Sequence, residues 1–151
     1  MATRQTTQGT SDGWTDEERA AMKEHAAEIR RAGGKGAAKA AEEAQACLNK
    51  IAEMPDADRV IAERIHAIVT ETAPDLTVKT WYGMPAYARD GKVVCFFKPA
   101  GKFKSRYATL GFTDKAMLDD GEMWPAAFAL KELTPATEAR ITALLRKAIG
   151  A

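Results

Sequence analysis

A change of periodicity at Pro74 constrains the fold more than any other feature of the sequence. Before Pro74, apolar side chains recur at helical spacing, most clearly in residues 57–73. After it, apolar and polar side chains alternate along residues 76–82, as in a β-strand with one buried face. Asp90-Gly91 then supplies the positive φ angles that a tight hairpin turn requires. The chain is therefore predicted to fold as helices followed by an antiparallel sheet.

Four helices are predicted. The first begins with a capping box formed by Thr15 and Glu18 and runs to Arg31, before a pair of glycines. Its apolar stripe is thin, so we expect this helix at the periphery of the domain or against another chain; the stripe consists of Met22, Ala26 and Ile29. The other helices are expected in residues 37–54, in residues 57–73, and after the start signal Thr134-Pro135.

The remaining pattern predicts about five strands. They are expected in residues 76–82, 86–89, 93–98, 103–112 and 128–133, with a short helical turn in residues 115–120. The predicted fold class is α+β, with an antiparallel sheet packed against N-terminal helices and a C-terminal helix. Residues 1–13 are expected to be a disordered tail, residues 14–36 a helix with a glycine-rich linker, and residues 37–151 the α+β domain.

The composition is that of a soluble globular protein. Hydrophobic residues make up 46% and charged residues 28% of the chain, and the net charge of +1 gives no overall attraction to nucleic acid or membranes. The N-terminus lacks the apolar segment of a secretory signal, and no long apolar run follows, so a cytoplasmic location without membrane contact is expected. Cys47 and Cys95 lie in apolar patterns and are interpreted as reduced core residues.

A series of short motifs resembles a known family. The run Trp81-Tyr82-Gly83-Met84-Pro85-Ala86-Tyr87 is followed by Asp90-Gly91-Lys92, Phe96-Phe97, Leu110-Gly111-Phe112 and Phe128-Ala129-Leu130-Lys131. This order, over about residues 40–149, is similar to the YdhG-like family of small bacterial proteins. The resemblance implies an α+β sheet domain with flanking helices. Members are generally of unknown biochemical function, and some are labelled iron chaperones by analogy with frataxin-like proteins.

Aromatic and cationic residues are concentrated in residues 77–112. This segment holds eight of the eleven aromatic residues, and seven cationic residues against one acid, Asp90. Strand alternation predicts an inner face formed by Val78, Tyr82, Val93, Cys95, Phe97, Phe103 and Tyr107. The outer face would gather Lys79, Trp81, Lys92, Phe96, Lys98, Lys102, Lys104 and Arg106. This face is interpreted either as an anion-binding surface with aromatic stacking platforms or as a solvated face whose lysines prevent aggregation.

The Tyr82-Gly83-Met84-Pro85 segment also allows two interpretations. It either lines a small pocket, with glycine permitting close approach and methionine an adaptable wall, or it is a structural strand break. The leading hypothesis is a non-enzymatic ligand-binding or interaction domain for a small anionic or aromatic molecule or an acidic protein surface. The candidate ligand-binding residues are Trp81, Tyr82, Met84, Pro85, Lys92, Lys98 and Arg106.

No catalytic constellation is recognisable. His25 and His66 each lack a ligand-spaced partner, and the apolar neighbours of Cys95 favour a buried, unreactive thiol. No cofactor is expected under the leading hypothesis; the alternative is a frataxin-like iron chaperone that binds iron through Asp119, Asp120 and Glu122. A third class is an enzyme whose site forms between the subunits of a homodimer. Nucleic acid is not favoured as a partner, because no RNA-recognition signature is present.

Overall fold

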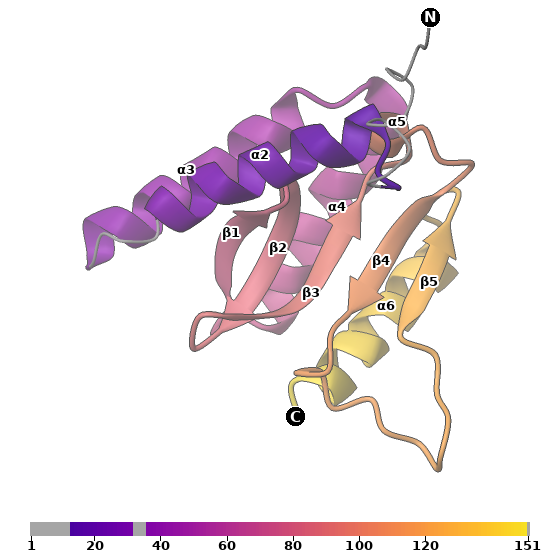
Figure 1. Ribbon diagram of the computed structural model, residues 1–151. Helices are drawn as coiled ribbons and strands as arrows, with labels where there is room; N and C mark the ends of the chain where they lie inside the picture. Colours follow the sequence, from indigo (N-terminus) through magenta and orange to yellow (C-terminus); the bar gives the residue numbers. More distant parts are fainter. Residues whose placement is uncertain (1–12, 32–35, 151) are drawn as a thin grey trace, which may run out of the picture.

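The sheet is an antiparallel meander in which each strand pairs with the next along the chain. The computed structural model describes residues 13–31 and 36–150, and its strand order is β1-β2-β3-β4-β5. The strands are β1 (Thr77–Trp81), β2 (Met84–Arg89), β3 (Lys92–Lys98), β4 (Ala108–Phe112) and β5 (Ala127–Leu130). The predicted α+β class, with five antiparallel strands, N-terminal helices and a C-terminal helix, is confirmed (Figure 1). The predictions for residues 1–12 and 32–35 lie outside the described residues.

Two hairpin turns with the same backbone conformation start the meander. The φ angles of Asp90 and Gly91 are 52° and 79°, and those of Tyr82 and Gly83 are 55° and 76°. Positive φ at both central residues is typical of a two-residue type I′ hairpin turn. The Asp90-Gly91 turn was predicted. The strand break expected before Pro85 is a second hairpin of the same kind, which joins β1 to β2.

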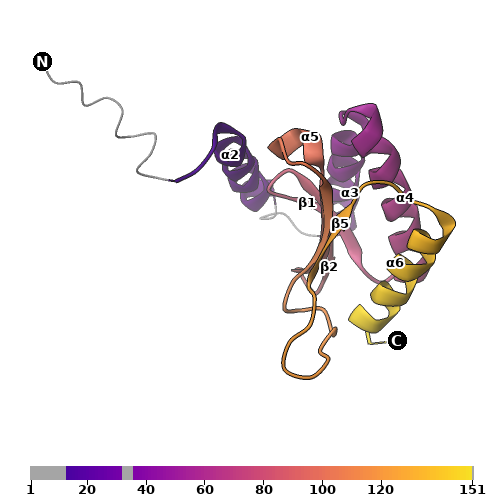
Figure 2. The same ribbon diagram turned by 90° about the vertical axis from the view of Figure 1, so that its right-hand side faces the viewer.

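Helices cover both faces of the sheet. Figure 2 shows α2 on one side and α3, α4 and α6 on the other. The helices are α2 (Asp16–Arg31), α3 (Ala37–Ala52), α4 (Asp56–Thr72), the short α5 (Ala100–Phe103) and α6 (Pro135–Ala148). We call the side of α3, α4 and α6 the inner face and the side of α2 the outer face. None of the helices in the described residues is long and apolar enough to cross a bilayer.

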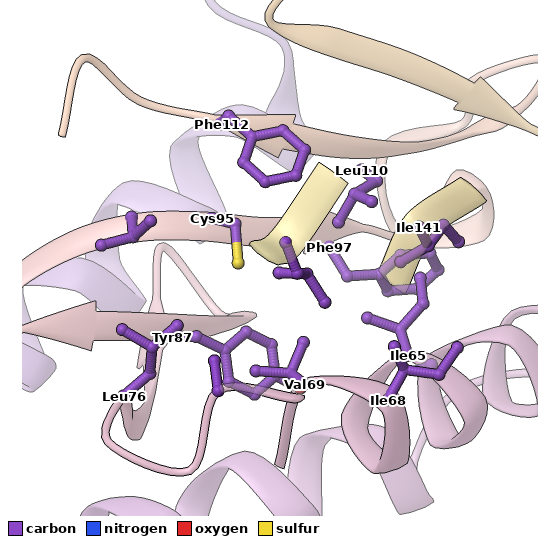
Figure 3. Close-up of a cluster of buried hydrophobic side chains, with 14 of the residues drawn as sticks. Ile65, Ile68, Val69, Leu76, Tyr87, Cys95, Phe97, Leu110, Phe112 and Ile141 are labelled. Carbon is purple, nitrogen blue, oxygen red and sulfur yellow. The ribbon is translucent and has the colours of Figure 1, made fainter. Parts of the chain in front are cut away.

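The hydrophobic core lies between the inner face and its helices. Tyr87, Phe97 and Leu110 project from β2, β3 and β4 toward Ile65 of α4 and Ile141 of α6 (Figure 3). Helical spacing on α4 and α6 and alternation along the strands produce this face, which includes Cys95 and Phe97 as predicted. Tyr82 and Val93 were also predicted there but line hollows on the outer face, because Tyr82 lies in the β1–β2 turn and the strand register shifts opposite Val93. The two cysteines, Cys47 and Cys95, are buried free thiols in the same core, and burial raises the pKa of each to about 12.

The predicted strand in residues 103–112 is wrong in its first half. Pro99 is followed by the short helix α5, and β4 begins at Ala108. The buried carboxylate of Asp58 on α4 accepts hydrogen bonds from the backbone N–H groups of Ala100 (3.2 Å) and Gly101 (2.8 Å), which stabilises the start of α5. As a result, Tyr107 is 38% exposed rather than part of the core.

Two smaller differences concern the C-terminal half. Residues 115–120 form no helix, and β5 is shorter than the strand predicted in residues 128–133. The start of α6 matches the prediction, because the Thr134 side chain accepts a hydrogen bond from the backbone N–H of Thr137 (3.2 Å) with Pro135 in the first turn.

Candidate functional site

Helix α2 presents an acidic face to the sheet. It begins with the predicted capping box: Thr15 N–H donates to Glu18 Oε1 (2.9 Å), and Glu18 N–H donates to Thr15 Oγ1 (3.0 Å). The predicted apolar stripe is not the buried face, since Met22 is 41% and Ile29 is 61% exposed. The side turned to the molecule instead carries Glu17, Ala21, Glu24 and Glu28, whose spacing places them along one side of a helix.

The carboxylate of Glu28 binds the backbone of the β1–β2 turn. Glu28 is 7% exposed; its Oε1 accepts a hydrogen bond from Tyr82 N–H (2.9 Å) and its Oε2 one from Gly83 N–H (3.0 Å). Successive backbone N–H groups in a turn form a small anion-binding concavity. His25 adds a second contact, because its Nδ1 lies 3.2 Å from Glu28 Oε1 and its ring stacks on Tyr82 with centroids 3.9 Å apart. The turn is therefore a docking point for α2.

Glu24 connects α2 to two further elements. The Nζ atoms of Lys50 on α3 and of Lys102 on α5 each lie 2.5 Å from one of its carboxylate oxygens. Burial by itself would raise the pKa of Glu24, but the hydrogen bonds from Lys102 and Lys50 outweigh burial and hold this pKa below its usual value. The positive φ angle of Gly83 favours glycine, and a Cβ there would displace the Glu24 carboxylate from its present position.

A third acid of α2 neutralises a third lysine. Lys104 Nζ lies 2.8 Å from Glu17 Oε2. The hydrogen bond between them lowers the pKa of Glu17 and raises the pKa of Lys104. Two lysines of the cationic segment, Lys102 and Lys104, are thus paired with carboxylates of the same chain.

A hollow of about 550 Å³ lies between α2 and the outer face. Its wall on the α2 side is formed by Trp14, Ala21 and Met22, and its opposite wall by Trp81, Tyr82, Met84, Phe96 and Phe103. We call it the aromatic hollow. Its volume is within the range of about 300–1,000 Å³ that is usual for small-molecule sites.

Close approach of two strands fixes the floor of the aromatic hollow. Phe96 on β3 pairs with Gly111 on β4, and a Cβ at Gly111 would collide with the Phe96 ring. The Phe96 ring also contacts Trp81, with centroids 5.3 Å apart and an angle of 59° between the rings. Gly111 thus allows Phe96 to lie across β4, where it forms a rigid aromatic surface with Trp81.

Lys98 is the cationic residue of the aromatic hollow. It is half-buried, and its Nζ lies 5.0 Å from the centroid of the Phe103 ring. Within the described residues Lys98 forms no ion pair, in contrast to Lys102 and Lys104. Glu18 also lines the hollow, but one of its carboxylate oxygens is engaged in the capping box. The aromatic hollow therefore combines a large apolar surface with one lysine, Lys98, whose charge is not paired with a carboxylate of the described residues.

The structure brings four of the seven predicted site residues together. Trp81, Tyr82, Met84 and Lys98 all line the aromatic hollow. Pro85 is fully buried and does not line it. Lys92 lines a separate hollow at the other end of the outer face, and the guanidinium of Arg106 lies 5.1 Å from the Tyr107 ring, in the exposed connection before β4. The expected continuous basic face is thus divided, and α2 covers part of it.

The alternative metal site finds no support in the geometry. Among the described residues, no group of three or more His, Cys, Asp and Glu side chains is arranged to hold a metal ion. Asp119, Asp120 and Glu122 are exposed along the loop between β4 and β5. His66 Nδ1 lies 3.1 Å from the hydroxyl oxygen of the buried Tyr87, and burial lowers the pKa of this histidine. His66 is therefore a structural residue of the core boundary.

Sequence reasoning missed the residues that attach α2. Glu28, Glu24 and Lys50 were not among the candidates, because the prediction for this helix rested on its apolar stripe. The spacing of Glu17, Glu24 and Glu28 was the available signal, since an acidic row on one side of a helix favours pairing with a cationic segment elsewhere in the chain.

Comparison with known proteins identifies no relative of this chain. No family model, no curated protein and no solved structure matches it. The resemblance to the YdhG-like family therefore stays a prediction, and the functional argument depends on the geometry of the site.

Proposed function

We propose that this protein is a non-enzymatic binding domain for a small aromatic monoanion, held in the aromatic hollow. The flat body of the ligand would lie against Trp81 and Phe96, and its carboxylate or similar group would pair with Lys98. The observation that carries this proposal is a half-buried lysine, with no ion pair in the described residues, at the side of an aromatic hollow of about 550 Å³. Burial of aromatic surface supplies affinity, and the cation selects ligands with one negative group.

Helix α2 supports this role because it forms one wall of the aromatic hollow. A ligand in contact with Trp14 before α2, with Met22 on α2 and with Trp81 on β1 buries apolar surface on both sides at once. An acidic protein partner is the weaker candidate, since carboxylates of α2 already pair with Lys50, Lys102 and Lys104. We place the function in the cytoplasm, where buried free thiols such as Cys47 and Cys95 stay reduced.

NMR titration with a matched pair of ligands tests the proposal. The pair is 2-naphthoate, an aromatic monoanion, and 2-naphthalenemethanol, its neutral analogue. Trp14 and Trp81 line the aromatic hollow, and Trp124 lies elsewhere, in the loop between β4 and β5. We expect naphthoate to shift the indole N–H signals of Trp14 and Trp81 and to leave that of Trp124 in place.

Two lysine variants distinguish the contribution of the Lys98 charge to ligand binding from the contribution of apolar contact. Lys98→Met should weaken naphthoate binding about tenfold, or about 1.4 kcal/mol, with little effect on the alcohol. Lys147→Met, which removes an exposed lysine of α6 on the inner side, is the control and should bind both ligands as the unaltered protein does. The proposal fails if neither ligand shifts the Trp14 and Trp81 signals, or if Lys98→Met binds naphthoate as tightly as the control.

A further inference from the structure

A second hollow, of about 310 Å³, lies on the outer face where β3 begins and β4 ends. Three lysines from three elements line it: Lys79 on β1, Lys92 on β3 and Lys115 in the loop after β4. We call it the lysine hollow. Because these residues are far apart in the sequence, their convergence is a product of the fold and not of a local run of charge.

The three lysines differ from the other cations of the outer face in their partners. Within the described part of the chain, none of the three forms an ion pair, whereas Lys102 and Lys104 each bind a carboxylate of α2. Asp114 is the acidic residue that lines the lysine hollow, and His25, which also lines it, is engaged with Glu28. Three ammonium groups against one carboxylate leave a local excess of positive charge, which a bound anion would offset.

The arrangement suits a phosphate group better than a carboxylate. A phosphate monoester carries a charge of about −1.5 to −2 near neutral pH and three acceptor oxygens, which suits a hollow lined by three lysines. We propose that the lysine hollow binds the phosphate group of a small ligand, through Lys79, Lys92 and Lys115. The phosphate forms charge-assisted hydrogen bonds to the three Nζ atoms, and no covalent step is involved.

Trp81 connects the lysine hollow to the aromatic hollow, because it lines both. A ligand with an aromatic body and a phosphate group can therefore occupy the two hollows at once. This spanning arrangement rests on the proposed function, whereas binding of a phosphate group to the three lysines does not.

Inorganic phosphate tests the lysine hollow by itself. In ¹H–¹⁵N NMR titrations at constant ionic strength, we expect phosphate to shift the backbone signals of Lys79, Lys92 and Lys115 while chloride does not. The double variant Lys79→Gln/Lys115→Gln should weaken the phosphate response about tenfold. The double variant Lys131→Gln/Lys147→Gln removes the same charge from the β5–α6 region and should keep the response of the unaltered protein. Equal responses to phosphate and chloride, or equal losses in the two double variants, overturn the proposal.

Naphthyl phosphate tests the spanning arrangement. We expect 1-naphthyl phosphate to bind at least about tenfold more tightly than either inorganic phosphate or 2-naphthalenemethanol, because one molecule then uses both hollows. Lys79→Gln/Lys115→Gln should remove this advantage and leave binding of the alcohol unchanged. If phosphate binds at the lysines and naphthyl phosphate gains nothing, the spanning arrangement is wrong and the phosphate site stands. If the naphthyl compounds fail to shift Trp14 and the phosphate response persists, the proposed function is wrong and the phosphate site stands.

Discussion

The helices on the two faces of the sheet are held by different interactions, apolar packing on the inner face and mainly charged contacts on the outer face. On the inner face, apolar side chains of α4 and α6 pack against Tyr87, Phe97 and Leu110. On the outer face, α2 contributes the buried Ala21 and the His25 ring stacked on Tyr82, and its other contacts come mainly from carboxylates that bind lysines and the backbone of the β1–β2 turn. Apolar burial depends little on salt or pH, whereas ion pairs respond to both. The outer cover should therefore loosen under conditions that leave the core intact.

The largest effect is expected from the inner face. Phe97 is fully buried in the core, so Phe97→Ala should lower the free energy of unfolding by about 3–5 kcal/mol. Urea unfolding followed by circular dichroism measures this loss, which should be nearly the same at low and high salt. Met123→Ala is the control, because Met123 is 89% exposed and its replacement should change the free energy by less than about 0.5 kcal/mol. Equal losses in the two variants would contradict the location of the core.

A smaller effect is expected from the attachment of α2 to the β1–β2 turn. Glu28→Gln should destabilise this attachment by about 1–3 kcal/mol, because an amide cannot accept hydrogen bonds with both of its terminal atoms. Hydrogen exchange should accelerate at the backbone amides of Tyr82 and Gly83 and stay unchanged at Phe97. Glu42→Gln, an exposed change on α3, provides the control. A uniform increase of exchange through the core would show that α2 is not a separate layer.

Acidification is expected to act on the outer cover through Glu24. The folded-state pKa of Glu24 lies below its ordinary value of 4.5, so its contribution to stability is complete above about pH 4.5 and declines as the pH falls through the folded-state value. Hydrogen exchange of α2 amides measured from pH 6 down to pH 3, corrected for the intrinsic pH dependence, should show this loss. The Glu24→Gln variant should lack this component. A pH profile that this variant shares with the unaltered protein would rule out Glu24 as the titrating group.

The smallest effect is expected from salt at the exposed pair of Glu17 and Lys104. Raising the ionic strength to 1 M shortens the screening length to about 3 Å, which weakens exposed ion pairs. Amide exchange in the first turns of α2 should therefore increase with salt, and this increase should be reduced in Lys104→Met. An unchanged salt dependence in Lys104→Met would assign the effect to other charges of α2.

Sequence patterns predicted the inner half of this molecule well because buried apolar side chains recur at regular intervals along its helices and strands. The α4 stripe, the Asp90-Gly91 hairpin and the start of α6 each follow from a local rule. The outer half depends on contacts between distant residues, such as Glu28 with Gly83, which are 55 positions apart. Phe103 and Tyr107 were misplaced because their segment has strand-like composition, whereas the contact of Asp58 with Gly101, 43 positions away, stabilises the start of a short helix there.

The site residues divide in the same way, into those that local patterns indicate and those that depend on contacts between distant segments. Trp81, Tyr82, Met84 and Lys98 were found because their residue types cluster in the sequence, and the strands bring them to one place. The wall contributed by Trp14 and Met22 was not found, since nothing local to α2 indicates where it docks. The positive charge of residues 77–112 was evident from the sequence, but the pairing of Lys102 and Lys104 with carboxylates of α2 could be learned only from the structure.

The contact between Asp58 and α5 links the inner side of the protein to the proposed binding surface on the outer face. Asp58 belongs to α4 on the inner side, yet it holds the short helix that carries Phe103 at the rim of the aromatic hollow. The position of Phe103 therefore depends on Asp58, which does not line the aromatic hollow. Substitutions on the far side of the sheet are accordingly a route by which evolution or design can tune ligand preference while the contact residues stay constant.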